Sequence, residues 1–160
     1  MNLNYLAFFL ISFLPLIIGY FWYHPDYAIS KWSGEEYQFG NRLSPFKIFV
    51  LFVLSFTLVY GYINLIIHQM GFYELFFTDI MKGSEESELI VQEFLAKYGD
   101  KHRHFGHGVF HGIINAFVFA LPFIGCFAIL EGRSRKFVMH HLSYWIVTSA
   151  IIGGLISEFV

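Results

Sequence analysis

Four long runs of apolar residues dominate the chain, and polar segments separate them. The runs cover residues 5–23, 48–68, 107–130 and 137–157, and none of them contains an Asp, Glu, Lys or Arg. A helix of about 20 apolar residues crosses a hydrocarbon core about 30 Å thick. The first run lacks a basic start and a small-residue cleavage site, so we expect a retained helix and not a signal peptide. The pattern predicts an all-α polytopic membrane protein, a single domain (1–160) built as a four-transmembrane-helix bundle.

The long segment between the second and third runs, residues 71–106, contains the signals of one short helix. Ser84 precedes Glu85 and Glu86, the arrangement of an N-cap followed by acidic residues in the first turn. An apolar stripe with helical spacing follows, made by Val91, Leu95 and Tyr98, and Gly99 supplies a stop. We expect an amphipathic helix at about 85–98 that lies on the membrane face. The alternative is a soluble helix folded over the mouth of the bundle.

The connections and their charges indicate an orientation. The first loop carries turn signals at Pro25, Gly34, Gly40 and Pro45, and residues 131–136 form a tight turn. The basic residues on the side of these two shorter loops are Lys31, Arg42, Lys47, Arg133, Arg135 and Lys136. Acidic residues dilute the basic ones of the long loop. By the positive-inside rule, we expect the two shorter loops on the cytoplasmic side, with the termini and the long loop extracytoplasmic.

Composition agrees with a lipid environment. Hydrophobic residues make up 56% of the chain and charged residues only 14%, whereas soluble domains carry about 25% charged residues. The formal net charge of −2 gives no electrostatic basis for nucleic-acid binding. The expected partner is therefore the lipid bilayer, with a larger membrane complex or a homodimer as candidates.

Polar residues with helical spacing occur where the second run ends and the third begins. His104, His107, His111 and Asn115 fall within an arc of about 80° on a helix. Tyr60, Asn64 and His68 recur at every fourth position near the end of the second run. Because polar side chains avoid lipid, we expect both stripes to face the bundle interior, where they could face each other.

Several imidazoles at one end of a bundle suit zinc, copper, iron or the axial positions of a haem. The hypothesis is a metal or haem site formed by His68, His107 and His111, with His104 as a candidate fourth ligand. The alternative is that these histidines form hydrogen bonds between helices or contact interfacial water. No carboxylate or cysteine ligand accompanies them in the pattern.

A second polar and aromatic group is predicted at the opposite end of the bundle, roughly 30 Å away. We expect it to contact lipid headgroups or an anionic ligand, with ordinary interfacial anchoring together with hydrogen bonds as the alternative. Its members are Trp22, Tyr23, His24, Trp32, Arg133, Arg135, Lys136, His140 and His141, and Tyr144 is expected in the polar interior one turn further. The separation excludes a single di-iron centre that uses both histidine groups.

Small residues indicate where helices approach each other closely. Gly108 and Gly112 form a Gly-x-x-x-Gly motif in the third run, and Gly153-Gly154 lies within the fourth. Such motifs permit close backbone contact. We interpret them as packing within the bundle, and homodimerisation is the alternative.

Trp22, Tyr23, Pro25, Tyr27 and Trp32 have the spacing Trp-Tyr-x-Pro-x-Tyr-x(4)-Trp. With this motif the chain resembles a bacterial membrane family catalogued as domain of unknown function 1761. In the second half, the resemblance rests on His107-Gly108, His111-Gly112, Pro122, Glu131-x-Arg133, His141 and Tyr144-Trp145. It implies four helices, a place in the bacterial inner (cytoplasmic) membrane and no assigned activity, and the segment 71–106 is longer than is usual for the family.

The residues identify no catalytic group. We expect a structural or accessory membrane component. The first alternative is a redox protein that binds a transition metal or haem through the extracytoplasmic histidines. The second alternative, a lipid- or quinone-binding protein, rests on the abundance of aromatic residues, which are 21% of the chain.

Overall fold

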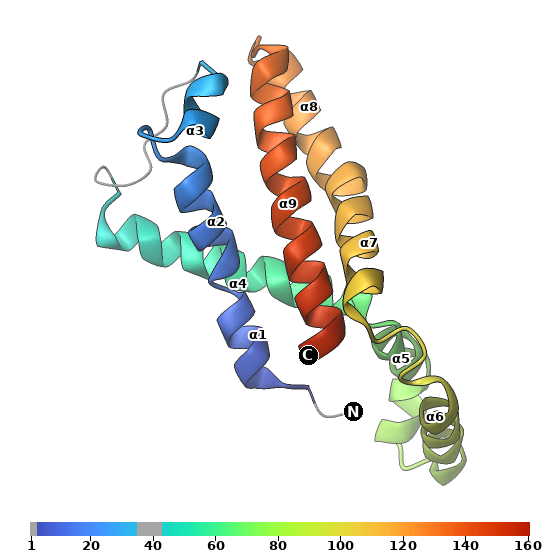
Figure 1. Cartoon of the computed structure of the whole chain (residues 1–160). Coiled ribbons are helices and arrows are strands. Elements are labelled where there is room, and N and C mark those ends of the chain that lie inside the picture. The colour runs from blue at the N-terminus through green and yellow to red at the C-terminus, as the bar shows by residue number, and fades with distance from the viewer. Residues whose placement is uncertain (1–2, 35–42) are drawn as a thin grey trace.

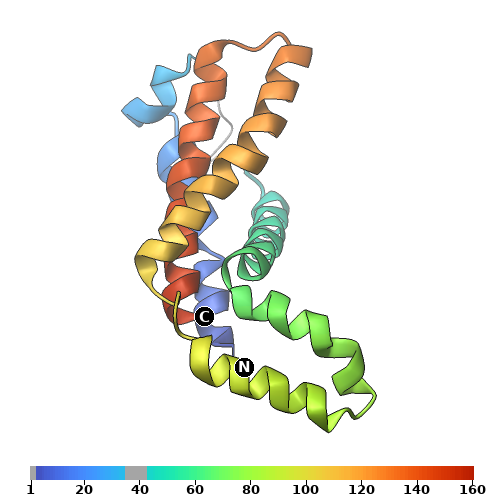
Figure 2. The ribbon, with the colours of Figure 1, turned by 90° about the vertical axis from the view of Figure 1, so that its right-hand side faces the viewer.

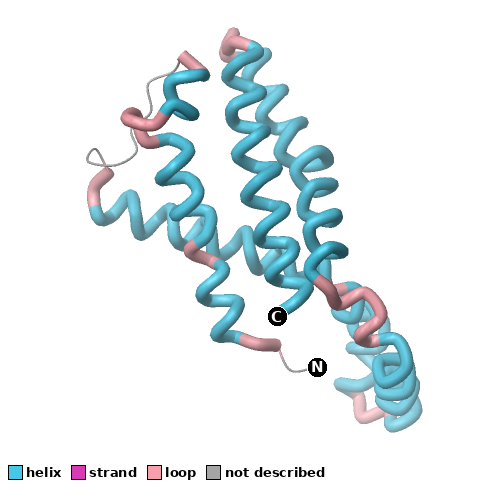
Figure 3. Tube along the Cα trace, in the orientation of Figure 1, coloured by secondary structure: helices cyan, strands magenta, loops and turns pink. Residues whose placement is uncertain are grey.

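The computed structural model describes residues 3–34 and 43–160, and within these ranges every secondary-structure element is helical (Figures 1 and 3). The predicted turn at Gly40 and the basic residue Arg42 lie outside the described residues. The elements are α1 (Tyr5–Ile11), α2 (Leu14–Tyr23), α3 (Ala28–Trp32), α4 (Pro45–Ile66), α5 (His68–Met81), α6 (Glu85–Tyr98), α7 (Phe105–Asn115), the π-helical turn η1 (Ala116–Ala120), α8 (Leu121–Leu130) and α9 (Arg135–Phe159).

Four helical stretches are long and apolar enough to cross a membrane, as the four apolar runs predict. They are Tyr5–Tyr23, Pro45–Ile66, Phe105–Leu130 and Arg135–Phe159. The first is interrupted between α1 and α2, just before Pro15 at the start of α2. The third contains η1, which ends at Ala120, two residues before Pro122. Proline lacks the N–H that continues an α-helix, which accounts for irregular turns at these two places.

The antiparallel pair of α7 and α9 forms the most extensive helix–helix contact in the described chain. Glycine makes this contact possible. A Cβ atom on Gly108 would collide with the backbone oxygen of Gly153, and one on Gly112 would collide with that of Ser149. The Gly-x-x-x-Gly motif therefore packs within the chain, and α9 covers the face that a homodimer would need.

The helix α4 crosses the other helices steeply instead of standing upright beside them (Figures 1 and 2). Its inner face packs into an aliphatic cluster with α9, which includes Val59, Ile63, Ile152 and Ile156. It contacts α1, α2, α7 and α9. Of the four long apolar helices that the sequence predicts, α4 is therefore the inclined one, and it lies across the α7–α9 pair (Figure 1).

The segment between the second and third spans forms a helical hairpin that extends away from the other helices (Figure 2). Its second helix, α6, begins after the N-cap Ser84 and ends at Tyr98, as predicted. Its first helix, α5, was not predicted, because residues 71–83 were interpreted as loop. Phe72 of α5 stacks on Phe94 of α6 with ring centroids 3.9 Å apart, which holds the two helices together.

The glycine contact between α7 and α9 yields a direct prediction. Gly112→Ala places a methyl group against the Ser149 backbone, which cannot rotate away, so we expect a loss of stability of about 1–3 kcal/mol. Unfolding in detergent, followed by circular dichroism, measures this loss. Gly125→Ala is the matched control, because its Cβ meets open space. Equal stability of the two variants would contradict the close approach.

Candidate metal centre

Three histidines from two helices meet where α5 joins the membrane-type helices. His68 is the first residue of α5, and His107 and His111 lie one turn apart on α7. One ring nitrogen from each lies within 4.8 Å of the others. Nε2 of His68 lies 3.3 Å from Nε2 of His107. The structure thus brings together the three residues that the sequence hypothesis placed in one site.

The glycines of α7 determine where its histidines point. Each histidine directly precedes a glycine that packs on α9, His107 before Gly108 and His111 before Gly112. Neighbouring residues on a helix are about 100° apart. With the glycine side fixed against α9, both imidazoles therefore project toward α5.

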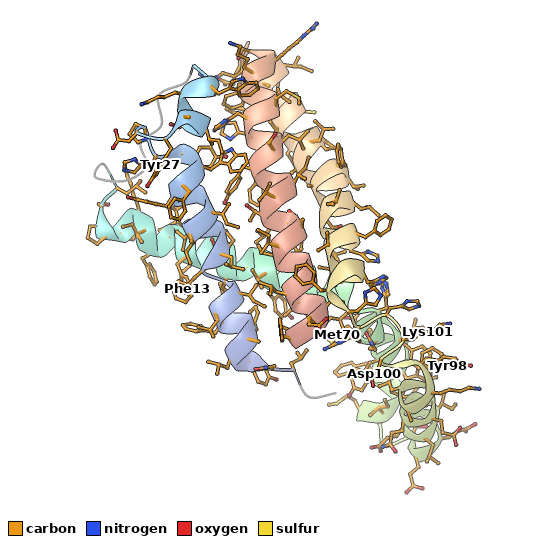
Figure 4. All side chains as sticks on the ribbon, in the orientation of Figure 1. Phe13, Tyr27, Met70, Tyr98, Asp100 and Lys101 are labelled. Atoms are coloured by element: carbon orange, nitrogen blue, oxygen red, sulfur yellow. The ribbon has the colours of Figure 1, made fainter. Side chains whose placement is uncertain are left out.

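The start of α7 is also fixed from outside the helix. Glu158, near the end of α9, accepts a hydrogen bond from the backbone N–H of Phe105 at 2.8 Å. Ser157 Oγ donates to the carbonyl of His102 at 3.4 Å. These contacts tie the α6–α7 linker to the C-terminal end of α9, close to the labelled residues Asp100 and Lys101 (Figure 4).

His68 reaches the site because the chain leaves the helical conformation at Ile67. This residue has φ −89° and ψ 90°, and its side chain is buried together with that of Ile66. The redirected helix α5 is held to the end of α6 by Gln69, whose side-chain amide donates to the carbonyl of Gly99. The bend therefore carries the His68 imidazole toward α7.

The geometry suits a bare metal ion better than a haem. Ligand nitrogens of a tetrahedral zinc ion, with bonds of about 2.0–2.1 Å, lie about 3.3 Å apart. The His68–His107 pair has this separation, and a ring nitrogen of His111 lies within 4.8 Å of both. The three ring centroids are 4.5 to 5.4 Å apart. Axial haem ligands stand on opposite faces of a flat macrocycle, and this spacing leaves no room for one between the rings.

Imidazole ligands suit Zn²⁺, Cu²⁺, Ni²⁺ and iron. Within residues 3–34 and 43–160, no Asp, Glu or Cys ligand atom belongs to the group. Three neutral ligands leave a fourth tetrahedral position for water or an added ligand. His102 stacks on His107 with centroids 5.1 Å apart, and it packs beside the group without belonging to it.

His104 has a different role from the predicted fourth ligand. It is the N-cap of α7, and its Nδ1 accepts a hydrogen bond from the backbone N–H of His107 at 3.1 Å. The ligand group does not include it. The prediction placed His104 on the helix, whereas its extended backbone turns the side chain back onto the helix end.

The predicted interior position is wrong for two of the four polar residues. Tyr60 is 59% exposed and Asn64 is also exposed, because α4 buries the face that contains Val59 and Ile63. Asn64 instead donates to the carbonyl of Tyr60 at 3.3 Å, which satisfies its amide within its own helix. Asn115 and Tyr144 are buried.

The second histidine group forms the contact between α2 and α9. Tyr23 OH lies 2.8 Å from His141 Nδ1, and the Trp22 indole N–H donates to the His140 carbonyl at 3.2 Å. Tyr144 OH donates to the carbonyl of Pro15 at 2.8 Å. These contacts support the alternative in which this second histidine group forms hydrogen bonds between helices.

The remaining members of that group lie around α3 and at the α8–α9 turn. His24 Nδ1 is 3.6 Å from Asp26 Oδ2, and Trp32 is exposed on α3. Arg133, Arg135 and Lys136 are exposed at the α8–α9 turn, where the Arg133 guanidinium lies over the Phe137 ring. Their exposure suits contact with a membrane surface.

Sequence reasoning missed a buried hydrogen bond between α4 and α9. Tyr62 OH donates to Ser149 Oγ at 2.7 Å, with both residues buried. The signal was present in α9, where Ser149, Gly153 and Ser157 recur at every fourth residue as a small-residue face. This small-residue face predicts that another helix packs closely against α9, but it does not identify which helix.

No protein-family model, curated protein or solved structure matches the chain. The resemblance to the family named above therefore remains a prediction from the motif residues. The functional interpretation rests on the geometry of the chain itself.

The cap role of His104 is testable by exchange. Asparagine caps helices well, so His104→Asn is expected to keep both stability and zinc affinity, while His104→Ala loses about 1 kcal/mol of stability and keeps zinc affinity. Calorimetric zinc titration and thermal unfolding measure the two quantities. A loss of zinc affinity in both variants would instead make His104 a ligand.

Proposed function

We propose that this chain is an integral membrane protein that binds a first-row transition metal ion, with zinc as the reference ion, through His68, His107 and His111. The observation that carries the proposal is the convergence of three ring nitrogens within 4.8 Å from helices distant in sequence. The ion attaches the α5–α6 hairpin to the membrane-spanning helices. This is a structural role in an accessory membrane component and requires no catalytic residue.

Membrane insertion is supported by the apolar surface of the four candidate spans. Their outward side chains include Phe123 and Ile129, the latter 82% exposed. Water-exposed surfaces rarely carry so much contiguous apolar area. The start of α1, the end of α9 and the α5–α6 hairpin lie at one end of the molecule, and the α8–α9 turn lies at the other (Figure 1). Four crossings require this arrangement.

The orientation proposed from the basic residues is unchanged. Lys31, Lys47 and the exposed residues of the α8–α9 turn favour the cytoplasmic side for the short connections. The hairpin and the metal group are then extracytoplasmic in a bacterial inner membrane.

The accessory role is favoured by the hairpin itself. Outside the candidate spans, Leu75 and Met81 of α5 and Leu89 of α6 are largely exposed. The hairpin also lacks broad contact with α7 and α9. A metal ion shared by His68 and α7 would fix the direction of the α5–α6 hairpin. A hairpin with a fixed direction can offer its exposed apolar residues to a larger membrane complex.

Zinc binding tests the site directly. In His111→Ala we expect the affinity for Zn²⁺ to fall by more than about 100-fold, since even the loss of an outer contact to a metal ligand costs about 10–100-fold. Titration calorimetry of the purified protein measures it, and the visible bands of bound Co²⁺ report the geometry. His24→Ala is the control. His24 is the C-cap of α2 and does not belong to the metal group, so its substitution is expected to leave the zinc affinity unchanged. Equal zinc affinities of wild type, His111→Ala and His24→Ala would refute the site.

Zinc is also expected to order the hairpin. Amide hydrogen exchange in α5 and α6 should slow when zinc is added to the wild-type protein, because the ion attaches the free-standing hairpin to α7. The same addition to His111→Ala should change nothing. Zinc binding without slower exchange would retain the site and reject its structural role.

A further inference from the structure

A pocket of about 360 Å³ opens where the α5–α6 hairpin meets the linker to α7. Its apolar wall is aromatic. Phe72 of α5 stacks on Phe94 of α6, and the ring centroid of Tyr98 lies 5.0 Å from that of Phe94. The charged part of the wall comes from the linker, which contributes Lys101 and Arg103. The pocket therefore joins an apolar surface to two positive charges.

These two positive charges have no negative counterpart in the pocket. None of the described residues that line it is acidic. Lys101 is exposed and Arg103 is half-buried, and neither forms an ion pair with a carboxylate of the described chain. Asp100, their neighbour in the sequence, is exposed and does not line the pocket. Charges withdrawn from water are stabilised by a partner of opposite sign, so this wall favours an anionic ligand.

The other polar side chains of the wall already have contacts of their own. The Gln69 amide donates to a backbone carbonyl at the end of α6. His68 belongs to the metal group, and His102 stacks on His107. The pocket thus adjoins the metal group on the side of His68, but its positive charge comes from the linker and is present without a metal ion.

The pocket lies at the level where two candidate spans end. Ile66, which lines it, is the last residue of the span Pro45–Ile66, and Arg103 lies two residues before the span Phe105–Leu130. If these helices cross the membrane as proposed above, this is the level of the phospholipid headgroups. Basic side chains attract headgroup phosphates at this level, and aromatic side chains are enriched there.

We propose that this pocket binds the phosphate group of an anionic phospholipid. Lys101 and Arg103 donate to the phosphate oxygens, and the apolar part of the lipid packs against the aromatic wall. The choline of a zwitterionic phospholipid would bring a further positive charge to the same place, so the pocket discriminates against that headgroup. The inference rests on the proposed membrane insertion and does not depend on the metal ion.

The first test removes both charges. Native mass spectrometry of the detergent-solubilised protein, with EDTA present, measures the binding of dioleoylphosphatidylglycerol and dioleoylphosphatidylcholine. We expect wild type to prefer phosphatidylglycerol by about 10-fold or more. A variant that combines Lys101→Gln and Arg103→Gln should bind the two lipids alike. A preference that survives in this variant would overturn the proposal.

The matched control combines Lys82→Gln and Lys97→Gln. It removes the same charge from the same hairpin, and neither residue lines the pocket, so it should retain the wild-type preference. Equal loss in both double variants would reduce the effect to net charge and overturn the pocket. Lys101→Gln alone changes an exposed side chain and should lower the preference by about 3- to 5-fold. It tests the proposal even if a double variant fails to fold, and an unchanged preference would count against it.

Competition tests whether the phosphate comes from a lipid. Glycerol phosphate and inorganic phosphate carry the anion without an apolar body, so neither should displace phosphatidylglycerol at equal concentration. Displacement by either would identify free phosphate as the ligand and overturn the lipid. A protein that stays soluble without detergent would refute the membrane insertion itself, whereas equal lipid binding by the two double variants refutes only the pocket. Zinc titration is a separate measurement, so the metal group stands or falls independently.

Discussion

The structure depends on the close approach of two backbones, those of α7 and α9. Gly108 and Gly112 on one helix face Gly153 and Ser149 on the other, at a separation that excludes a Cβ on either glycine of α7. In lipid, apolar side chains gain nothing by leaving their solvent, so tight packing between small residues and buried hydrogen bonds hold helices together. The Tyr62–Ser149 and Tyr144–Pro15 bonds add α4 and α2 to this pair. The other helices are arranged around a contact that permits almost no adjustment.

The geometry of the metal group follows from the rotation of α7 that this contact fixes. The glycines occupy the side against α9, so the neighbouring residues His107 and His111 project toward α5. One packing contact therefore determines which way the imidazoles of α7 face.

Much of this could be predicted from the sequence, and the failures have physical reasons. The apolar runs predicted four long helices, Ser84 and Gly99 predicted the bounds of α6, and the His107–His111 spacing predicted a shared face. The break at Ile67 carries no Gly or Pro signal, so α5 and the redirection of His68 were missed. Tyr60 and Asn64 were misplaced because an exposed amide can bond to its own helix, so a polar stripe does not establish the inner face. The inclination of α4 arises from packing with distant residues, which no local pattern encodes.

The central claim is that His68, His107 and His111 converge on a single metal ion. X-ray absorption at the zinc edge of the zinc-loaded full-length protein tests it most directly, because it counts and identifies the ligands at the ion. The account predicts about three imidazole nitrogens at about 2.0–2.1 Å, with one further light ligand. A first shell of oxygen alone, or one with a single imidazole, would contradict it.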